Sequence, residues 1–127
     1  MNKEQRIMNK DANNVALNKS IDFAVRIVKL YKYLTANKRE TVMSKQLLRS
    51  GTSVGANVRE AVYAQSKADF ISKMHIALKE ASETEYWLEL LRRTDYLTQN
   101  EHENIVADCV EMLKILTAIV KSAKANQ

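Results

Sequence analysis

The sequence contains only two glycines, at positions 51 and 55, and no proline in 127 residues. Hairpin turns and the loops of alternating strands and helices depend on these two residue types, so this chain lacks the breaks that β-rich folds require. Its many Leu, Ala, Lys and Glu residues favour helix. We therefore expect an all-α protein. Its length and hydrophobic content of 46% suffice for one domain with a single core.

The two glycines stand four residues apart, which allows three interpretations: a phosphate-binding loop, a flexible turn, or a helix surface open to close packing. A Walker loop needs a second glycine five positions after the first, but Ala56 stands there, and the pattern G-x-G-x-x-G is absent. A turn would interrupt the apolar helical stripe on which Gly51 and Gly55 lie. Because a glycine inside a helix costs up to about 1 kcal/mol, we expect both to serve close packing against a facing helix.

Apolar residues recur with helical periodicity in four segments separated by short polar stretches. Ser66 with Asp69, and Thr98 with Glu101, form capping-box patterns that predict the starts of the third and fourth helices. Short connections make consecutive helices antiparallel neighbours, so we expect an antiparallel up-down-up-down four-helix bundle over residues 15–124, preceded by a mobile polar tail over residues 1–14. In the first helix the residues expected to face the core are Leu17, Ile21, Ala24, Ile27, Val28, Tyr31 and Leu34.

The net charge of +5 is unevenly distributed. Residues 1–50 hold 11 Lys or Arg against 4 Asp or Glu, a net +7, whereas residues 51–127 hold 9 against 11, a net −2. This asymmetry permits an acidic partner without requiring one, because a solvated basic helix face has the same composition. We expect RNA or DNA to bind a line of cations on the second helix, and an acidic protein is the alternative partner. The line comprises Lys45, Arg49 and Arg59, and Lys19, Arg26, Lys29 and Lys32 are secondary candidates.

Two further surfaces suggest self-assembly. On the second helix a line of small polar side chains runs beside the basic line, and on the third helix a second apolar patch lies away from the expected core stripe of Phe70, Met74, Ala77, Leu78, Ala81 and Leu88. Aromatic and aliphatic residues away from the core are typical of protein interfaces. The alternatives are a solvated face and a tryptophan that wraps the edge of the bundle. The expected oligomer interface comprises Ile76, Trp87, Leu90, Ser50, Ser53 and Asn57.

No residue pattern indicates an enzyme, a cofactor or a metal. A di-iron bundle needs Glu three residues before an inward His, but Ser72 precedes His75 and Gln99 precedes His102 at that spacing. The Arg-to-His spacing of four-helix ribonucleases is also absent. The single cysteine lies in an apolar pattern and is expected to be an inert buried thiol. We expect no catalytic residues.

Neither a secretory leader nor a membrane span is evident. The N-terminus lacks the apolar region of a signal peptide, and no apolar run reaches the roughly 18 residues of a transmembrane helix. We expect a cytoplasmic protein.

The block Ser44-Lys-Gln-Leu-Leu-Arg-Ser-Gly-Thr-Ser-Val-Gly-Ala-Asn-Val-Arg-Glu-Ala61, with the stretches 66–74 and 77–88, resembles the 23S rRNA-intervening sequence protein family. The resemblance implies an antiparallel four-helix bundle that assembles into a ring, a homopentamer, without known enzymatic activity. A related branch, the accessory proteins of diversity-generating retroelements, forms basic pentameric barrels that bind nucleic acid and a reverse transcriptase. Because site residues and not the fold determine function, the resemblance leaves the biochemical role open.

Overall fold

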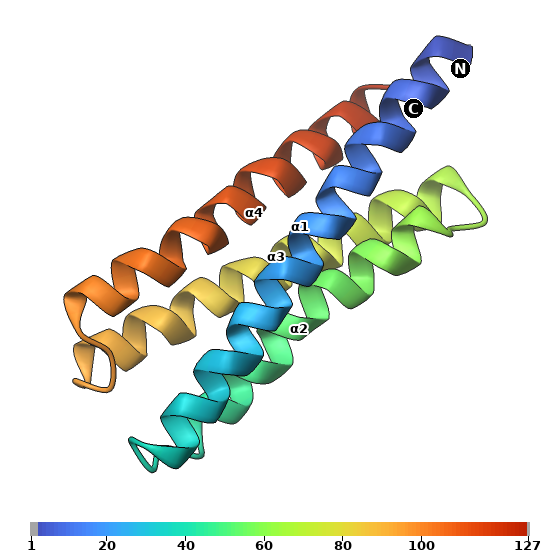
Figure 1. Cartoon of the computed structure of the whole chain (residues 1–127). Helices are drawn as coiled ribbons and strands as arrows, with labels where there is room; N and C mark the ends of the chain where they lie inside the picture. Colours follow the sequence, from blue (N-terminus) through green and yellow to red (C-terminus); the bar gives the residue numbers. More distant parts are fainter. Residues whose placement is uncertain (1–2, 127) are drawn as a thin grey trace.

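The computed structural model describes residues 3–126, which form four helices and no strand. They are α1 (Lys3–Ala36), α2 (Met43–Val62), α3 (Lys67–Arg93) and α4 (Gln99–Ala125). Each helix packs on the next along the chain, and α1 also contacts α4, though more sparsely. Figure 1 shows the α1–α2 and α3–α4 connections at one end of the bundle and both termini at the other. The predicted all-α up-down bundle is therefore confirmed.

The first helix begins earlier than predicted. Residues 3–14, which we expected to form a polar tail, continue α1 without a break, and residues 1–2 lie outside the described residues. No glycine or proline separates these residues from the rest of α1, so nothing in the local sequence ends the helix there.

Two predicted helix starts are present. The Ser66 hydroxyl accepts a hydrogen bond from the Asp69 N–H at 3.1 Å and caps α3. At α4 both halves of a capping box form, because the Thr98 hydroxyl accepts from the Glu101 N–H at 3.1 Å and the Glu101 carboxylate accepts from the Thr98 N–H at 2.8 Å.

The start of α2 has a different cap, which the sequence analysis missed. The buried Glu40 carboxylate accepts hydrogen bonds from the backbone N–H groups of Val42, Met43 and Ser44, at 3.0, 2.9 and 2.7 Å. Burial raises the pKa of Glu40, but these N–H groups outweigh burial and leave the pKa below its ordinary value. Glu40 therefore fixes the α1–α2 connection to the first turn of α2.

The glycines lie in the contact between α1 and α2. Both are fully buried on α2, facing Ile27 and Ser20 of α1. A Cβ atom on Gly51 would lie 2.8 Å from Cγ2 of Ile27, and one on Gly55 would lie 3.2 Å from the Ser20 hydroxyl oxygen. Glycine at position 51 therefore leaves the space that the Ile27 side chain fills.

The inward face of α1 differs from the predicted stripe. Its buried residues are Ala16, Ser20, Phe23, Ile27 and Leu34, whereas Ile21 is 39% exposed and Val28 is half-buried. The apolar arc of α1 is wider than one stripe, and the contact with the α2 glycines orients α1 so that Ser20 and Ile27 point inward. The predicted stripe of α3 is closer to the structure, since Met74, Ala77, Ala81 and Leu88 are buried.

Candidate functional site

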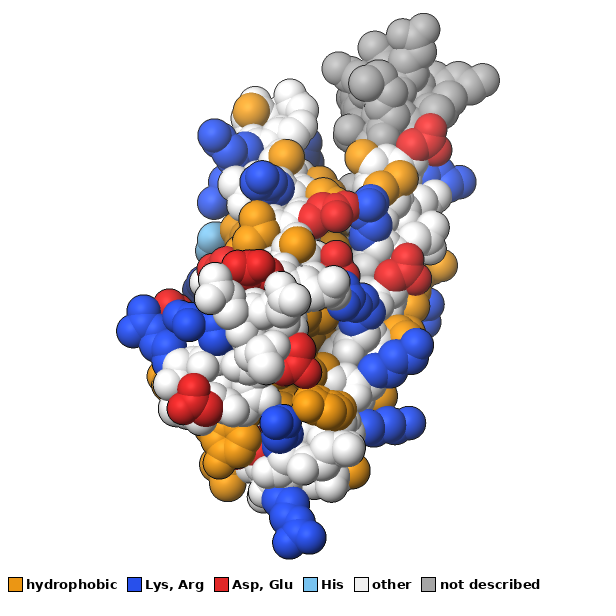
Figure 2. All heavy atoms as spheres, turned by 60° about the vertical axis from the view of Figure 1, so that its left-hand side comes forward, with side chains coloured by type: hydrophobic (Ala, Val, Ile, Leu, Met, Phe, Trp, Pro, Cys, Tyr) orange, Lys and Arg blue, Asp and Glu red, His pale blue; other side chains and the backbone are white. Residues whose placement is uncertain are grey.

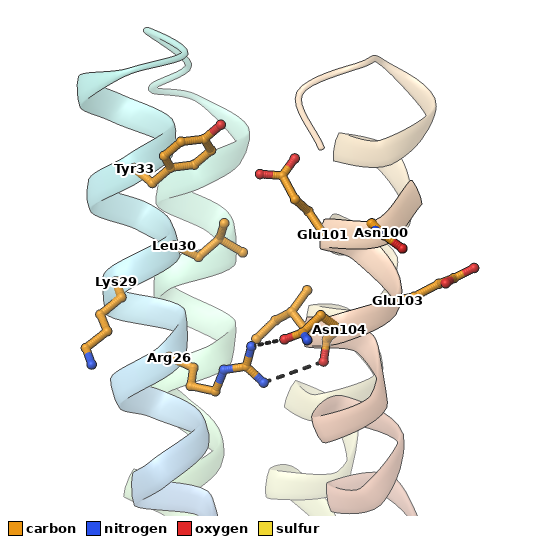
Figure 3. A pocket seen from close by; sticks show the side chains of 9 residues that line it. Arg26, Lys29, Leu30, Tyr33, Asn100, Glu101, Glu103 and Asn104 are labelled. Carbon is orange, nitrogen blue, oxygen red and sulfur yellow. Dashed lines mark hydrogen bonds between the residues drawn. The ribbon is translucent and has the colours of Figure 1, made fainter. Parts of the chain in front are cut away.

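Two of the predicted cations form ion pairs with residues of the same chain, where α1 meets α4. Lys19 pairs with Glu111, and Arg26 pairs with Asp108 and also bonds to the Asn104 side chain. The hydrogen bond to Glu111 raises the pKa of Lys19. Figure 3 shows the guanidinium of Arg26 turned toward Asn104. Because their charges are matched by α4, Lys19 and Arg26 contribute little to an outward basic surface.

Arg49 forms ion pairs on another side of the bundle, between α2 and α3. Its guanidinium bonds to Glu80 at 3.0 Å and also to Glu83, both on α3. Glu83 in turn accepts a hydrogen bond from the Trp87 indole N–H at 3.0 Å. The pKa of Glu83 is lowered first by this indole N–H and then by Arg49. Arg49 and Trp87 thus belong to one network that closes the outer edge between α2 and α3.

The remaining predicted cations have no such acidic partners. Lys29, Lys32, Lys45 and Arg59 are exposed and form no ion pair among the described residues. Lys29 points away from the space between α1 and α4 (Figure 3). The structure thus divides the predicted cations into three side chains with acidic partners and four without such partners among the described residues.

The α1–α2 connection adds two exposed cations that the sequence analysis passed over as a polar break. Lys38 and Arg39 lie in this connection, Lys32 lies in the last turns of α1, and Lys45 lies in the first turn of α2. We call Lys32, Lys38, Arg39 and Lys45 the loop-end cluster. Figure 2 shows Lys and Arg side chains standing out at the lower end of the molecule, which carries this connection, and along one edge above it.

A groove runs along the outside of α1 and α2, and no sequence signal was assigned to it. It has a volume of about 780 Å³. Ile21 and Val25 line it and are 39% and 47% exposed. Lys29, Lys32 and Arg59 also line it, and Lys32 belongs to the loop-end cluster as well. We call this feature the outer groove, and its other lining residues include Ala24, Val28, Thr52, Gly55 and Ala56.

The predicted interface residues do not form one surface. Ser50 is fully buried and hydrogen-bonded to Thr84 within the chain, so its assignment to an oligomer interface is corrected. Ser53 and Asn57 are half-buried and bond to carbonyl groups of α2 itself. Ile76 is exposed, whereas Leu90 is half-buried.

Trp87 is also half-buried, and it packs against the core cluster. It therefore wraps the edge of the bundle, as in the alternative interpretation, while part of it remains at the surface.

Three titratable groups, Cys109, His102 and Glu85, are buried or half-buried. Cys109 is buried and its thiol donates to the Ala81 carbonyl at 3.3 Å, and burial raises its pKa to about 12. Burial, with a smaller effect of Arg92, lowers the pKa of His102. Glu85 is half-buried and forms no hydrogen bond or ion pair in the described part of the chain.

Neither a cluster of metal-binding side chains nor a membrane-spanning helix is found among residues 3–126. Among residues 3–126, no three His, Cys, Asp or Glu side chains are placed to hold a metal ion together. The helices of this part of the chain are all too polar or too short in apolar sequence to cross a bilayer. The space between α1 and α4 in Figure 3, about 1080 Å³, has a lining of mixed charge, to which Arg26 and Glu101 contribute opposite charges.

Comparison with known proteins finds a matching family model and similar solved structures. The family model described as 23S rRNA-intervening sequence protein matches residues 12–118. A solved crystal structure of a protein with unknown function, from the S23 ribosomal protein family of Bacteroides thetaiotaomicron, is 61% identical. The similarity covers 87% of this chain and 98% of that chain, with a TM-score of 0.85. No curated protein matches the sequence.

Proposed function

The chain belongs to the 23S rRNA-intervening sequence protein family, and we propose that it is a non-catalytic, oligomeric binding module whose loop-end cluster engages RNA or DNA in the cytoplasm. The solved relative is itself described as having unknown function, so the proposal rests on this chain's own surface. The observation that carries it is the division of the cations: Lys19, Arg26 and Arg49 have acidic partners, whereas the loop-end cluster is exposed at one end of the bundle.

The cluster is compact along the helix axes. With a rise of 1.5 Å per residue, Lys32 lies about 6 Å before the end of α1, and Lys45 lies about 3 Å after the start of α2. Lys38 and Arg39 lie between them in the connection. Closely spaced cations displace counterions from a phosphate backbone, which gives binding that depends on salt and little on base sequence.

The connection that carries the cluster is anchored. Glu40, next to Arg39, binds three backbone N–H groups at the start of α2, and its own N–H donates to the Leu34 carbonyl at 3.0 Å. A connection fixed at both helices loses less conformational freedom when a ligand binds. In the homopentamer that the family resemblance implies, the cluster is present five times, and repetition strengthens a weak contact.

A second candidate function is that of a scaffold that docks an acidic protein. The outer groove favours it, because aliphatic side chains and three cations line the groove together, and grooves with such a lining receive amphipathic helices. The two candidates differ in the chemical nature of the partner.

Material that copurifies with the native protein at low salt tests the proposal. We expect nuclease-sensitive RNA or DNA without a dominant sequence, released by moderate salt. Copurification of an acidic protein that persists after nuclease treatment, with no nucleic acid, would instead establish the scaffold function.

A further inference from the structure

A pocket with a volume of about 530 Å³ lies at the end of the bundle that carries both termini and the α2–α3 connection (Figure 1). Residues of all four helices and of this connection line it. We call it the end pocket. Small-molecule sites in proteins have volumes of about 300–1,000 Å³. The end pocket is within this range, and it lies at the opposite end of the bundle from the loop-end cluster.

Small side chains leave the end pocket open. The α2 glycines bring α1 close to α2, but α1 contacts α4 only sparsely. Larger apolar side chains, Val62, Phe70 and Ile119, pack against the core cluster and separate the pocket from the core. Five lining residues are alanines, whose side chains are too short to fill the space between the helices: Ala12, Ala61, Ala64, Ala118 and Ala123.

Apolar and polar residues of the end pocket differ in exposure. Ala61 is buried, and Val62, Phe70 and Ile119 are half-buried. Apart from the half-buried Asn13, the polar lining residues are exposed: Gln65, Ser66, Lys67, Ser122 and Asn126. Sites of this kind hold a ligand through apolar contact and orient it through a few polar groups. The lining therefore suits a molecule with an apolar body and one polar group that stays near water.

The charge of the lining indicates the nature of that polar group. Among the residues that the structure describes, Lys67 is the only charged one that lines the end pocket. Its ammonium donates a hydrogen bond to the main-chain carbonyl of Asn126 at 2.9 Å, which places it between the start of α3 and the end of α4. An ammonium carries three N–H groups, so two remain for a ligand. The acid nearest to it along α3, Asp69, does not line the pocket, so an anion is favoured there.

We propose that the end pocket binds a small amphipathic carboxylate with an alkyl chain, the chain packed against Phe70 and Ile119 and the carboxylate bound by Lys67. Each methylene group that leaves water for an apolar site strengthens binding by up to about fourfold. The chain thus supplies most of the affinity, and Lys67 supplies the preference for an anion. The inference goes beyond the proposed function and does not depend on nucleic-acid binding.

Titration calorimetry on the full-length protein with octanoate, hexanoate and octanol tests the ligand class. We expect saturable binding of octanoate at one site per chain, and binding of hexanoate, which is two methylene groups shorter, weaker by up to about fifteenfold. Lys67→Gln should weaken octanoate binding about two- to fivefold, as expected for an exposed ion pair, and leave octanol binding unchanged. The matched control is Lys79→Gln, which removes an exposed lysine of α3 outside the pocket and should change neither affinity.

Filling the pocket tests its location. Ala118 and Ser122 are exposed lining residues of α4, so Ala118→Trp and Ser122→Trp should fold, as circular dichroism checks, and should abolish octanoate binding. Ala107→Trp places the same side chain at an exposed alanine of α4 outside the pocket and should bind octanoate like the wild type.

Three results would overturn the proposal. They are the absence of saturable octanoate binding by the wild type, unchanged binding in both pocket-filling variants, and a loss in Ala107→Trp equal to theirs. An effect of Lys67→Gln that is the same for octanoate and octanol would exclude an anion as the ligand. Nucleic-acid binding by the same proteins is measured separately, so any of these results leaves the proposed function intact.

Discussion

A buried hydrogen bond joins the hydroxyl groups of Thr84 on α3 and Ser50 on α2, whose oxygen atoms lie 2.9 Å apart. Both side chains are fully enclosed, in the most extensive helix contact of the bundle. Buried polar groups stabilise a fold only while they are paired. The pair therefore fixes how α2 and α3 fit together, and with them the faces that carry Arg49 and Trp87.

Replacing Thr84 with Val keeps the side-chain shape but removes the bond. We expect urea unfolding to show a free energy of unfolding lower by about 1–2 kcal/mol. The Ser50 hydroxyl then remains buried, and its only hydrogen-bond partner is the Leu47 carbonyl of its own helix. The double variant Thr84→Val/Ser50→Ala should lose less than the sum of the single variants. Additive losses would show that the two hydroxyl groups are not coupled.

The glycines should differ in their tolerance of alanine. Gly51→Ala places a Cβ against the branched, fully buried Ile27, and we expect a loss of about 1–3 kcal/mol in spite of the better helix propensity of alanine. In Gly55→Ala the new Cβ lies farther from its nearest neighbour, the Ser20 hydroxyl, so this variant should lose less stability. Thermal unfolding measures the stability of both variants. A Gly51→Ala variant as stable as wild type would contradict the close contact. Ile27→Ala, which removes both γ carbons that the new Cβ meets, should cost less stability in the Gly51→Ala background than in the wild type.

Glu40 should make the fold sensitive to acid. Its folded-state pKa is below the unfolded value, so its contribution is fully present above the unfolded pKa of about 4.3–4.5 and is lost as the pH falls through the folded pKa. Glu40→Gln should lower stability at neutral pH by about 1–2 kcal/mol, the magnitude of a lost helix cap. Denaturant unfolding at a series of pH values checks both effects. An unchanged dependence of stability on pH below 4.5 in Glu40→Gln would exclude this role.

Two cations on α2, Lys45 and Arg49, provide a matched comparison. Both are exposed and one helical turn apart, but only Arg49 has acidic partners. We expect Lys45→Gln to weaken nucleic-acid binding more than Arg49→Gln, although each removes one positive charge. Filter binding at low salt compares the nucleic-acid affinities of the two variants. Equal losses would mean that net charge, and not the position of exposed cations, determines affinity.

Local sequence signals predicted most of the fold. The residue pair Thr98 and Glu101 lies within four positions, so a capping box there is readable from the chain. Glu40 was missed because it caps α2 from the connection, where its use as a cap depends on the path of the backbone. The orientation of α1 was also missed, since its apolar arc is too wide to show from periodicity alone which part faces Gly51.

The candidate site was less predictable, because it depends on pairs of residues far apart in the chain. Lys19 and Glu111 are 92 positions apart, and Arg26 and Asp108 are 82 positions apart. A count of charges identifies these cations but not their partners. The outer groove was not predicted from the sequence, because Ile21, which lines it, was assigned to the core.

The salt dependence of nucleic-acid binding tests the central claim most directly. Fluorescence anisotropy with single-stranded RNA and duplex DNA, from roughly 50 to 300 mM salt, compares three proteins. They are the wild type, Lys38→Gln/Arg39→Gln/Lys45→Gln, and the control Lys114→Gln/Lys121→Gln/Lys124→Gln, which removes equal charge from exposed positions of α4. We predict that the loop-end variant binds more weakly, with a logarithmic salt slope smaller by about 0.7–0.9 for each lost phosphate contact, while the control matches the wild type. Absence of wild-type binding at the lowest salt, or equal slopes in the two variants, would contradict the account.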